Sequence, residues 1–181
     1  MMLGGLGTVR GSDEESFREF VAARRVPLQR TAFLLVGDRG HAEDLVAVVF
    51  SKLWFVWPRI RDEAPDAYTR RCLVNAATSW RRRRWHGEQP TGDLPNEVGM
   101  GDDTGRVDDR LLLRAALGKL TARQRAAVVL RFAEDLSEPE VAALLRCSVG
   151  TVKSLTSRGL ARIRQSGRSG LTTEVENGVG A

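Results

Sequence analysis

The sequence has few cysteines, histidines and lysines, and it has no long hydrophobic run. Its two cysteines, Cys72 and Cys147, lie far apart and form no CxxC pair, so neither a disulfide framework nor a zinc site is expected. The histidines, His41 and His86, stand alone. No segment approaches the roughly 20 uncharged apolar residues of a membrane-spanning helix, so we expect no membrane insertion. The first residues lack a basic stretch followed by an apolar one, which argues against a secretion signal and favours a cytoplasmic protein.

Motifs that carry catalysis are missing as well. The chain contains no glycine-rich phosphate loop, no nucleophile elbow and no HExxH pair. We therefore expect no catalytic residue, no metal and no cofactor. Because 42% of the 181 residues are hydrophobic, a folded core is expected nonetheless. The chain is interpreted as a folded binding protein rather than an enzyme.

Charge is distributed unevenly along the chain. Residues 13–86 carry a net charge of +4, residues 87–109 carry −6, and residues 110–168 carry +8. Two basic blocks separated by an acidic connector indicate two domains that bind a polyanion. Only three of the 28 basic residues are lysine, and arginine suits phosphate groups and base edges. A genome rich in G and C would enrich arginine equally, so this preference alone decides nothing.

Helical periodicity recurs through the chain and no alternation of period two persists, which predicts an all-α fold. In the first half, helices are expected over residues 12–26, 28–36, 41–57 and 66–85. The segment Ser12 to Glu15 reads as a capping box at the start of the first helix. Pro27 is expected to break or restart that helix, Pro58 to follow the end of the third, and Pro65 to lie in the first turn of the fourth.

The second half begins after a glycine-rich and acidic segment. Residues 87–108 contain five glycines, two prolines and a run of acids, and they indicate a flexible linker. Helices are expected to resume at Asp109, with capping boxes at Thr121 and Ser137 and a cap at Ser148 for a helix that ends near Arg164. The predicted organisation is two small helical domains (13–86 and 109–166), the acidic linker (87–108) and a disordered tail (167–181).

The segment from Ser137 to Arg164 has the pattern of a DNA-binding helix-turn-helix. Two short amphipathic helices are joined by a three-residue turn, and the open face of the second helix is basic. Residues on that face are expected to enter the major groove and contact base edges or phosphates: Gly150, Thr151, Lys153, Ser154, Ser157 and Arg158. An ordinary helical hairpin with a solvated basic face is the alternative interpretation.

The residues of this segment resemble a known family. Leu136 to Ser154 (LSEPEVAALLRCSVGTVKS) resembles region 4.2 of the sigma-70 family in its extracytoplasmic-function group, and Leu120 to Arg131 (LTARQRAAVVLR) resembles region 4.1. The resemblance implies that this domain recognises the −35 element of a promoter and meets the flap of core RNA polymerase.

The first half extends the resemblance. Residues 42–54 resemble region 2.2, which in the family binds the coiled coil of the largest polymerase subunit. Ala42, Leu45, Val46, Val49 and Leu53 form a core-facing stripe at helical spacing. The resemblance implies that another side of the helix meets polymerase, through Asp44, Ala47, Val48 and Ser51. A solvated helix N-terminus is the alternative interpretation of Asp44.

Residues 66–85 resemble regions 2.3 and 2.4. Basic residues and aromatic rings alternate there, as in surfaces that bind unpaired strands. The resemblance implies that this helix binds the −10 element and melts it, with Asn75 at a flipped base. The predicted contacts are Arg70, Arg71, Asn75, Trp80, Arg81, Arg82, Arg83 and Arg84. Core packing of Trp80 and solvation of the arginine run remain alternative interpretations.

The resemblance covers residues 13–166 and is closest to the actinobacterial SigE-like branch. It implies core polymerase, promoter DNA and an anti-sigma factor as partners. Six positions depart from the family pattern, among them Thr156 and Gly159, which stand where larger helix-forming residues are common. Ala47 and Val48 replace polar residues, Leu155 replaces a basic one, and Arg146 stands where glycine usually makes the turn. An arginine in a left-handed conformation there would cost on the order of 1 kcal/mol.

The leading hypothesis is a sigma factor that directs polymerase to promoters. A free-standing helix-turn-helix regulator and a degenerate sigma-like decoy for an anti-sigma factor are the alternatives. The basic and aromatic helix at 66–85 and the acidic linker argue against the free-standing regulator, which needs neither.

Overall fold

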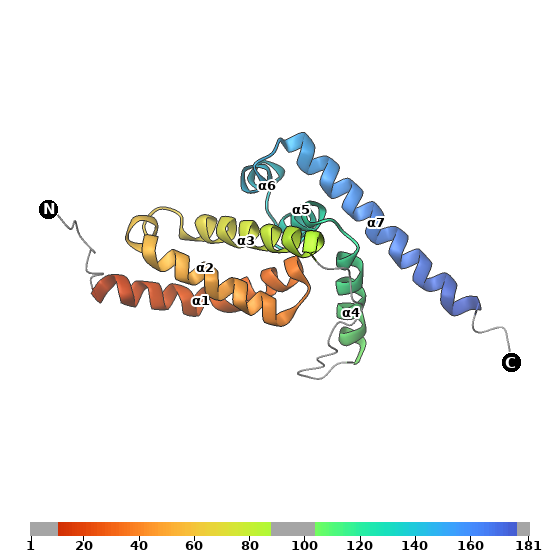
Figure 1. Cartoon of the computed structure of the whole chain (residues 1–181), viewed down its shortest axis with the longest axis horizontal. Coiled ribbons are helices and arrows are strands. Elements are labelled where there is room, and N and C mark those ends of the chain that lie inside the picture. The colour runs from red at the N-terminus through yellow and green to blue at the C-terminus, as the bar shows by residue number, and fades with distance from the viewer. Residues whose placement is uncertain (1–10, 88–103, 177–181) are drawn as a thin grey trace.

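The computed structural model describes residues 11–87 and 104–176, with side chains placed over 11–81 and 111–165. Within these ranges the chain forms seven α-helices and no strand, in agreement with the predicted all-α class (Figure 1). The helices are α1 (Gly11–Val36), α2 (Arg39–Ile60), α3 (Pro65–Gly87), α4 (Thr104–Gly118), α5 (Ala122–Phe132), α6 (Glu138–Leu145) and α7 (Val149–Glu176). None of the described helices is long and apolar enough to cross a bilayer.

The first three helices pack on one another and form the N-terminal half. The predicted stripe of α2 is buried, with Leu53 fully enclosed. Phe17 and Phe20 of α1 pack against Trp57 of α2, with ring centroids 5.1 and 4.9 Å apart. The tight turn between α1 and α2 uses Gly37, whose φ of 84° suits glycine. The carboxylate of Asp38 then caps α2 by accepting a hydrogen bond from the backbone N–H of His41.

The prolines do not end the helices as the sequence predicted. Pro27 lies inside a continuous α1, and Pro58 lies inside the last turn of α2. Proline costs about 3 kcal/mol within a helix because it removes one hydrogen bond and crowds the preceding turn. In α1 the burial of Leu28, Ala32 and Leu35 just after Pro27 stabilises the helix across the proline. Pro58 lies near the C-terminal end of α2, so only two residues of the helix follow the distortion that the proline introduces.

The predicted capping box at Ser12 is also wrong, because α1 already begins at Gly11 and Ser12 lies within it. The neighbouring Asp13 has a different partner: it is buried and pairs with Arg61, which follows α2. This ion pair joins the start of α1 to the end of α2.

The C-terminal half contains α4 to α7. The capping boxes at Thr121 and Ser137 are both present, as predicted. Two boundaries were predicted wrongly. α4 begins at Thr104, so residues 104–108 of the predicted linker are helical, and α7 continues through Glu176 instead of ending near Arg164 in a disordered tail. Gly87, the first residue of the predicted linker, is the last residue of α3, whereas residues 88–103 of that linker and residues 177–181 of the predicted tail lie outside the described residues.

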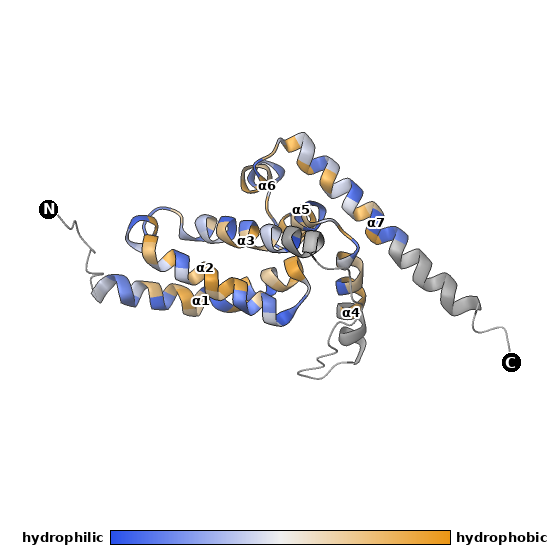
Figure 2. Ribbon diagram, in the orientation of Figure 1, coloured by the Kyte–Doolittle hydropathy of each residue, from blue (hydrophilic) through white to orange (hydrophobic). Residues whose placement is uncertain are grey.

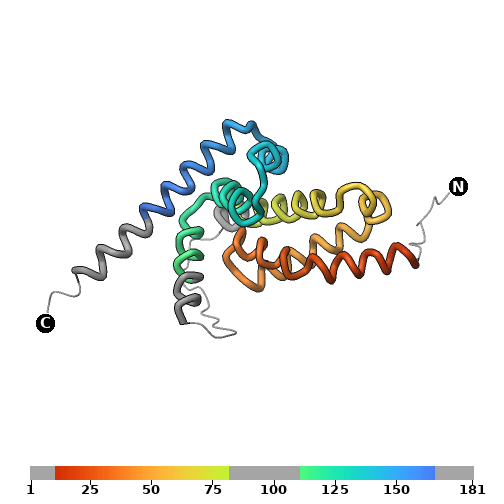
Figure 3. Tube along the Cα trace, turned by 180° about the vertical axis from the view of Figure 1, so that it is seen from behind, coloured from red at the N-terminus to blue at the C-terminus, as the bar shows by residue number. Residues whose placement is uncertain are grey.

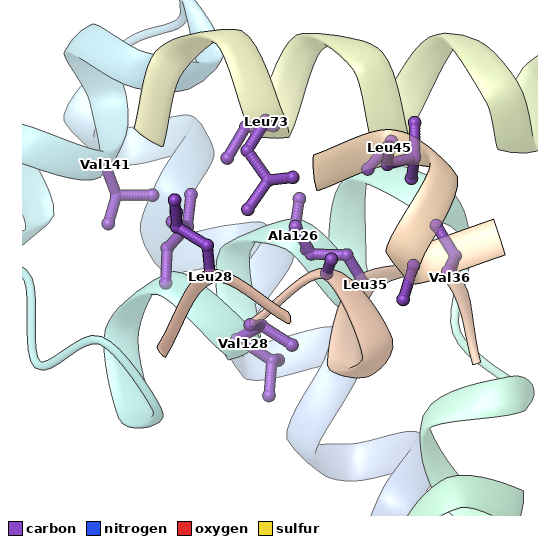
Figure 4. Close-up of a cluster of buried hydrophobic side chains, with 14 of the residues drawn as sticks. Leu28, Leu35, Val36, Leu45, Leu73, Ala126, Val128 and Val141 are labelled. Atoms are coloured by element: carbon purple, nitrogen blue, oxygen red, sulfur yellow. The ribbon is translucent and has the colours of Figure 1, made fainter. Parts of the chain in front are cut away.

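The two halves share one core. α5 packs against α1 and α3 of the N-terminal half, and against α6 and α7 of its own half. Buried side chains of both halves meet here, among them Leu28, Leu73, Val128 and Val141 (Figure 4). Seen from either side, α4 and α7 run away from the α1–α3 bundle (Figures 1 and 3). The sequence predicted two domains and a linker, and it did not predict this contact between them.

Gly159 of α7 packs closely against α5. Hydrophobic and polar residues alternate along the described part of α7, as on an amphipathic helix (Figure 2). Gly159 lies on the buried side, where an added Cβ would come within 2.8 Å of a methyl group of Val128. Val128 is itself buried, and its branched side chain has little room to move. A mid-helix glycine is therefore explained by packing.

Replacing Gly159 by alanine should destabilise the protein, although alanine favours helix by about 1 kcal/mol. Overpacking typically costs about 1–3 kcal/mol, so after the gain in helix propensity the net loss should be about 1 kcal/mol and at most about 2 kcal/mol. Gly150→Ala is the matched control on the same helix. Its added methyl would lie 3.8 Å from the hydroxyl of Ser148, an ordinary contact, so it should leave stability unchanged or raise it. Thermal unfolding of both variants gives the comparison, and equal stabilities would mean that Val128 moves aside freely.

Candidate nucleic-acid interface

The turn between α6 and α7 sets the direction of the predicted recognition helix. Arg146 ends α6 in the left-handed conformation, with φ 50° and ψ 56°, as its place in the turn predicted. Ser148 then begins α7: its hydroxyl accepts a hydrogen bond from the N–H of Thr151 at 3.1 Å. The three-residue turn and both caps thus produce the helix-turn-helix geometry that the sequence predicted.

The predicted contact residues lie along one side of α7. Gly150, Lys153, Ser157 and Arg158 are exposed, whereas Thr151 and Ser154 are half-buried. Their spacing of three and four residues keeps them on one helical face. On the opposite side Val152 and Gly159 are buried against the domain. This polar and basic face is free of the protein's own core, as a groove-reading helix requires.

Two details qualify this face. The ammonium of Lys153 lies 3.7 Å from the carboxylate of Glu138, so part of its charge is already compensated. Leu155, which stands where the family often has a basic residue, is half-buried. A charge at position 155 would therefore be partly removed from water, and leucine fits the site better.

α3 carries the second predicted DNA surface. Arg71 and Asn75 are exposed and lie one turn apart on the same side. The guanidinium of Arg71 also lies over the ring of Tyr68, 5.5 Å from its centroid. These groups combine a cation, an amide and an aromatic ring on one face, which suits an unstacked base and its backbone.

The remaining predicted residues of α3 are less available. Arg70 is half-buried and pairs with Glu134. Trp80 is half-buried and packs on His41, with ring centroids 4.6 Å apart, and Arg81 donates to the carbonyl of Leu120 at 3.1 Å. The side chains of Arg82, Arg83 and Arg84 lie outside the described residues. Arg71 and Asn75 are therefore an exposed pair, whereas Arg70, Trp80 and Arg81 also contact other elements of the fold.

The predicted protein-binding side of α2 is exposed as a whole. Asp44, Ala47, Val48 and Ser51 are all solvent-accessible, and Val48 is 46% exposed although it is apolar. Two turns beyond Val48, Phe55 is 83% exposed. The sequence analysis missed Phe55, although its spacing of seven residues from Val48 would have placed it on the same side. An apolar strip with an acid at one end is typical of a protein-binding surface.

Both halves of the chain match a known protein family. Residues 20–87 match the family description "Sigma-70 region 2", and residues 110–163 match "Sigma-70, region 4". The chain is 43% identical over 150 residues to the RNA polymerase sigma-E factor of Streptomyces coelicolor, covering 82% of this chain and 84% of that one. It is 31% identical over 133 residues to the ECF RNA polymerase sigma factor SigL of Mycobacterium tuberculosis, covering 70% and 75%. The chain belongs to the sigma-70 family, in its extracytoplasmic-function group.

A solved structure shows the same architecture. The sigma factor RpoE of Bartonella quintana, in complex with the anti-sigma factor NepR, superposes with a TM-score of 0.65 at 25% identity. The match covers 85% of this chain and 98% of that one, so it includes both halves. These comparisons confirm the resemblance drawn from the sequence, including its branch, and they identify this sigma factor's two halves as regions 2 and 4.

One arginine in the interior of this sigma factor has a lowered pKa. Arg125 of α5 is 2% exposed, and burial, together with the nearby Arg81 and Arg114, lowers the pKa of its guanidinium to about 9. Its N–H donates to the carbonyl of Leu34. The sequence analysis assigned no role to Arg125 or to Glu134, because both make contacts with distant parts of the chain.

Proposed function

We propose that this sigma factor uses three surfaces together: α7 for the −35 element, α3 for the −10 element, and the exposed side of α2 for core polymerase. The observation that carries the proposal is that one chain presents a helix-turn-helix face and an unpartnered apolar strip on different helices. A free-standing regulator needs only the first. The mechanism is binding and strand separation rather than covalent chemistry.

The roles divide by chemistry. Arg158, Lys153 and the hydroxyls of Thr151, Ser154 and Ser157 contact the −35 duplex around Gly150, where the backbone can approach closely. Arg71 follows the strand and Asn75 holds a flipped base, while Arg70, Trp80 and Arg81 to Arg84 add contacts to the melted strands. On α2, Asp44, Ala47, Val48 and Ser51 meet the coiled coil of the largest subunit, and Phe55 extends that contact. The flap meets region 4.

We further propose that an anti-sigma factor controls this chain, since the structurally similar RpoE is bound to one. The chain then acts where polymerase acts, in the cytoplasm. Binding of the anti-sigma factor competes with polymerase when both need the same side of α2.

Run-off transcription with purified core polymerase on genomic fragments tests the proposal. We expect discrete transcripts that require the chain and are absent with core enzyme alone. Asn75→Ala should reduce open-complex formation about tenfold or more, because hydrogen bonds from an amide to a base edge contribute about 1–3 kcal/mol. Arg25→Ala, an exposed change on α1 outside the three surfaces, is the control. Duplex binding without any transcript would support the free-standing regulator instead.

A further inference from the structure

The exposed face of α7 carries a lysine that already has an acidic partner. The ammonium of Lys153 lies 3.7 Å from the carboxylate of Glu138, the first residue of α6. The Lys153 side chain is 65% exposed and that of Glu138 is 34% exposed. α6 and α7 pack on each other across the short turn that joins them (Figure 1). In a helix-turn-helix the first helix crosses the DNA backbone and the second enters the groove, so Glu138 lies at the edge of the DNA-binding face.

The carboxylate of Glu138 takes no part in the cap of α6. That helix is capped by Ser137, whose hydroxyl accepts a hydrogen bond from the N–H of Glu140. The carboxylate of Glu140 in turn accepts hydrogen bonds from the N–H and the hydroxyl of Ser137, at 2.7 and 2.6 Å, and these bonds lower its pKa. Within the described part of the chain, the structure pairs the carboxylate of Glu138 with Lys153. The charge of Glu138 is therefore directed at α7 rather than at its own helix end.

The start of α6 is an unfavourable place for a phosphate. Helix N-termini commonly bind phosphate through free N–H groups and the helix dipole. In α6, Pro139 has no N–H to offer, and the carboxylates of Glu138 and Glu140 lie in the first turn, where they repel an anion. We therefore expect phosphate contacts to come from α7, where Lys153 and Arg158 are the exposed cations among the predicted contact residues.

The two cations of α7 differ in how they discriminate between sequences. The planar guanidinium of Arg158 fits the paired acceptors of a guanine, whereas the ammonium of Lys153 is a compact charge on a flexible stem. A flexible charge reaches a phosphate on any sequence, and phosphate contacts add affinity without sequence preference. The ion pair with Glu138 competes with the phosphate for Lys153 and thus reduces this indiscriminate contribution.

The same ion pair should interfere less on a matched site. There Lys153 can reach guanine acceptors in the groove, and such a contact is stronger than an ion pair exposed to water. The base then replaces Glu138 as the partner of the ammonium. On unmatched DNA the only gain from releasing Lys153 is about one counterion, so the pair with Glu138 remains competitive.

We propose that Glu138 is a positioning residue that sharpens promoter selection: it holds Lys153 away from the phosphate backbone until a base of the −35 element replaces it. The inference rests on the proposed function, because it takes α7 as the helix that enters the −35 duplex. It assigns a part in DNA discrimination to a residue of α6 that itself contacts no DNA. The ratio of matched to unmatched affinity is the quantity that matters, since a genome offers very many unmatched sites.

Glu138→Gln tests the proposal in the full-length chain, because glutamine keeps the shape of the side chain and removes its charge. On a random-sequence duplex, affinity should rise severalfold, with an upper limit of about eightfold at 0.1 M salt, and the salt dependence should steepen by up to about 0.9, the value for one phosphate contact. On a duplex that carries the −35 element mapped by run-off transcription, affinity should rise by a clearly smaller factor. Preference for the matched duplex therefore falls.

Asp135→Asn is the matched control. It removes an equal charge three residues before Glu138, at an exposed position, and asparagine tolerates the positive φ of 50° found there. Both affinities should stay within about twofold of the wild type, because salt screens an exposed charge that contacts no cation of α7. Thermal unfolding checks that each variant is folded.

A double variant shows whether Glu138 acts through Lys153. In a Lys153→Ala background, Glu138→Gln should recover only a small part of its effect, because no ammonium remains to be released. If the free chain binds both duplexes too weakly, the same ratio is measured with holoenzyme on promoter fragments with intact or scrambled −35 elements. The proposal is overturned if Glu138→Gln leaves the salt slope and the ratio unchanged, if both affinities rise equally, or if the gain persists without Lys153.

Failure of the proposed function gives a different pattern. If Arg158→Ala binds every duplex as the wild type does, α7 is not the recognition helix and the assignment of the −35 surface fails. If Arg158→Ala loses preference for the matched duplex while Glu138→Gln keeps it, the assignment of α7 stands and the role of Glu138 alone is rejected.

Discussion

Replacing Asp44 by arginine should abolish binding to core polymerase while the protein stays folded. Asp44 is exposed on α2, away from the buried stripe. Surface substitutions usually change stability by less than about 0.5 kcal/mol, and a lost contact with the helix dipole adds a few tenths. In an interface, a misplaced charge can cost several kcal/mol. Since 1.4 kcal/mol corresponds to a tenfold change, affinity for polymerase should fall on the order of a thousandfold.

Co-purification with core enzyme and run-off transcription measure this loss, and thermal unfolding checks the fold. Glu19→Arg is the matched control, because it makes the same charge reversal at an exposed position of α1. Duplex DNA binding through α7 should be unchanged in both variants. A folded Asp44→Arg protein that still forms active holoenzyme would exclude Asp44 from the polymerase interface.

Alanine at Arg158 should weaken binding to the −35 duplex by about 1–3 kcal/mol, or roughly ten- to a hundredfold, if its guanidinium reads a base. Preference at one base pair should then relax, because the lost hydrogen bonds are specific to that base. If Arg158 contacts only phosphate, binding should weaken equally on all sequences and the dependence on salt should become shallower. Lys153→Ala should have a smaller effect, because Lys153 already lies near Glu138.

Titrations on matched and mismatched duplexes distinguish these two modes. Arg164→Ala is the control, because it removes the same charge from an exposed position further along α7. It should lower affinity only slightly and leave the preference among duplexes unchanged. If Arg158→Ala behaves like this control, the assignment of α7 as the recognition helix is wrong.

Local signals in the sequence predicted much of this fold correctly. Hydrogen bonds that span three residues define the caps at Thr121, Ser137 and Ser148, so short motifs suffice to predict them. The left-handed conformation of Arg146 was expected from the resemblance, because glycine usually stands at this place in the family's turn. The buried stripe of α2 and the exposed face of α7 follow from helical periodicity.

Features that depend on distant parts of the chain could not be predicted in this way. Pro27 is tolerated because the residues after it pack against other helices, and the sequence around it still reads as a break. Gly159 looks unfavourable in a helix until Val128 is placed beside it. Arg125 and Glu134 make contacts 91 and 103 residues away along the chain, and no motif encodes such distances.

The absence of a side chain at Gly159 has a consequence for how this protein could acquire new promoter preferences. The close packing of Gly159 against Val128 helps to set how α7 lies on α5. Residues on the far side of the helix, such as Ser157 and Arg158, can then be exchanged without altering the angle at which the helix is presented. The orientation of α7 and the bases that it contacts are thus determined by different residues, so the contacts can change while the orientation is kept.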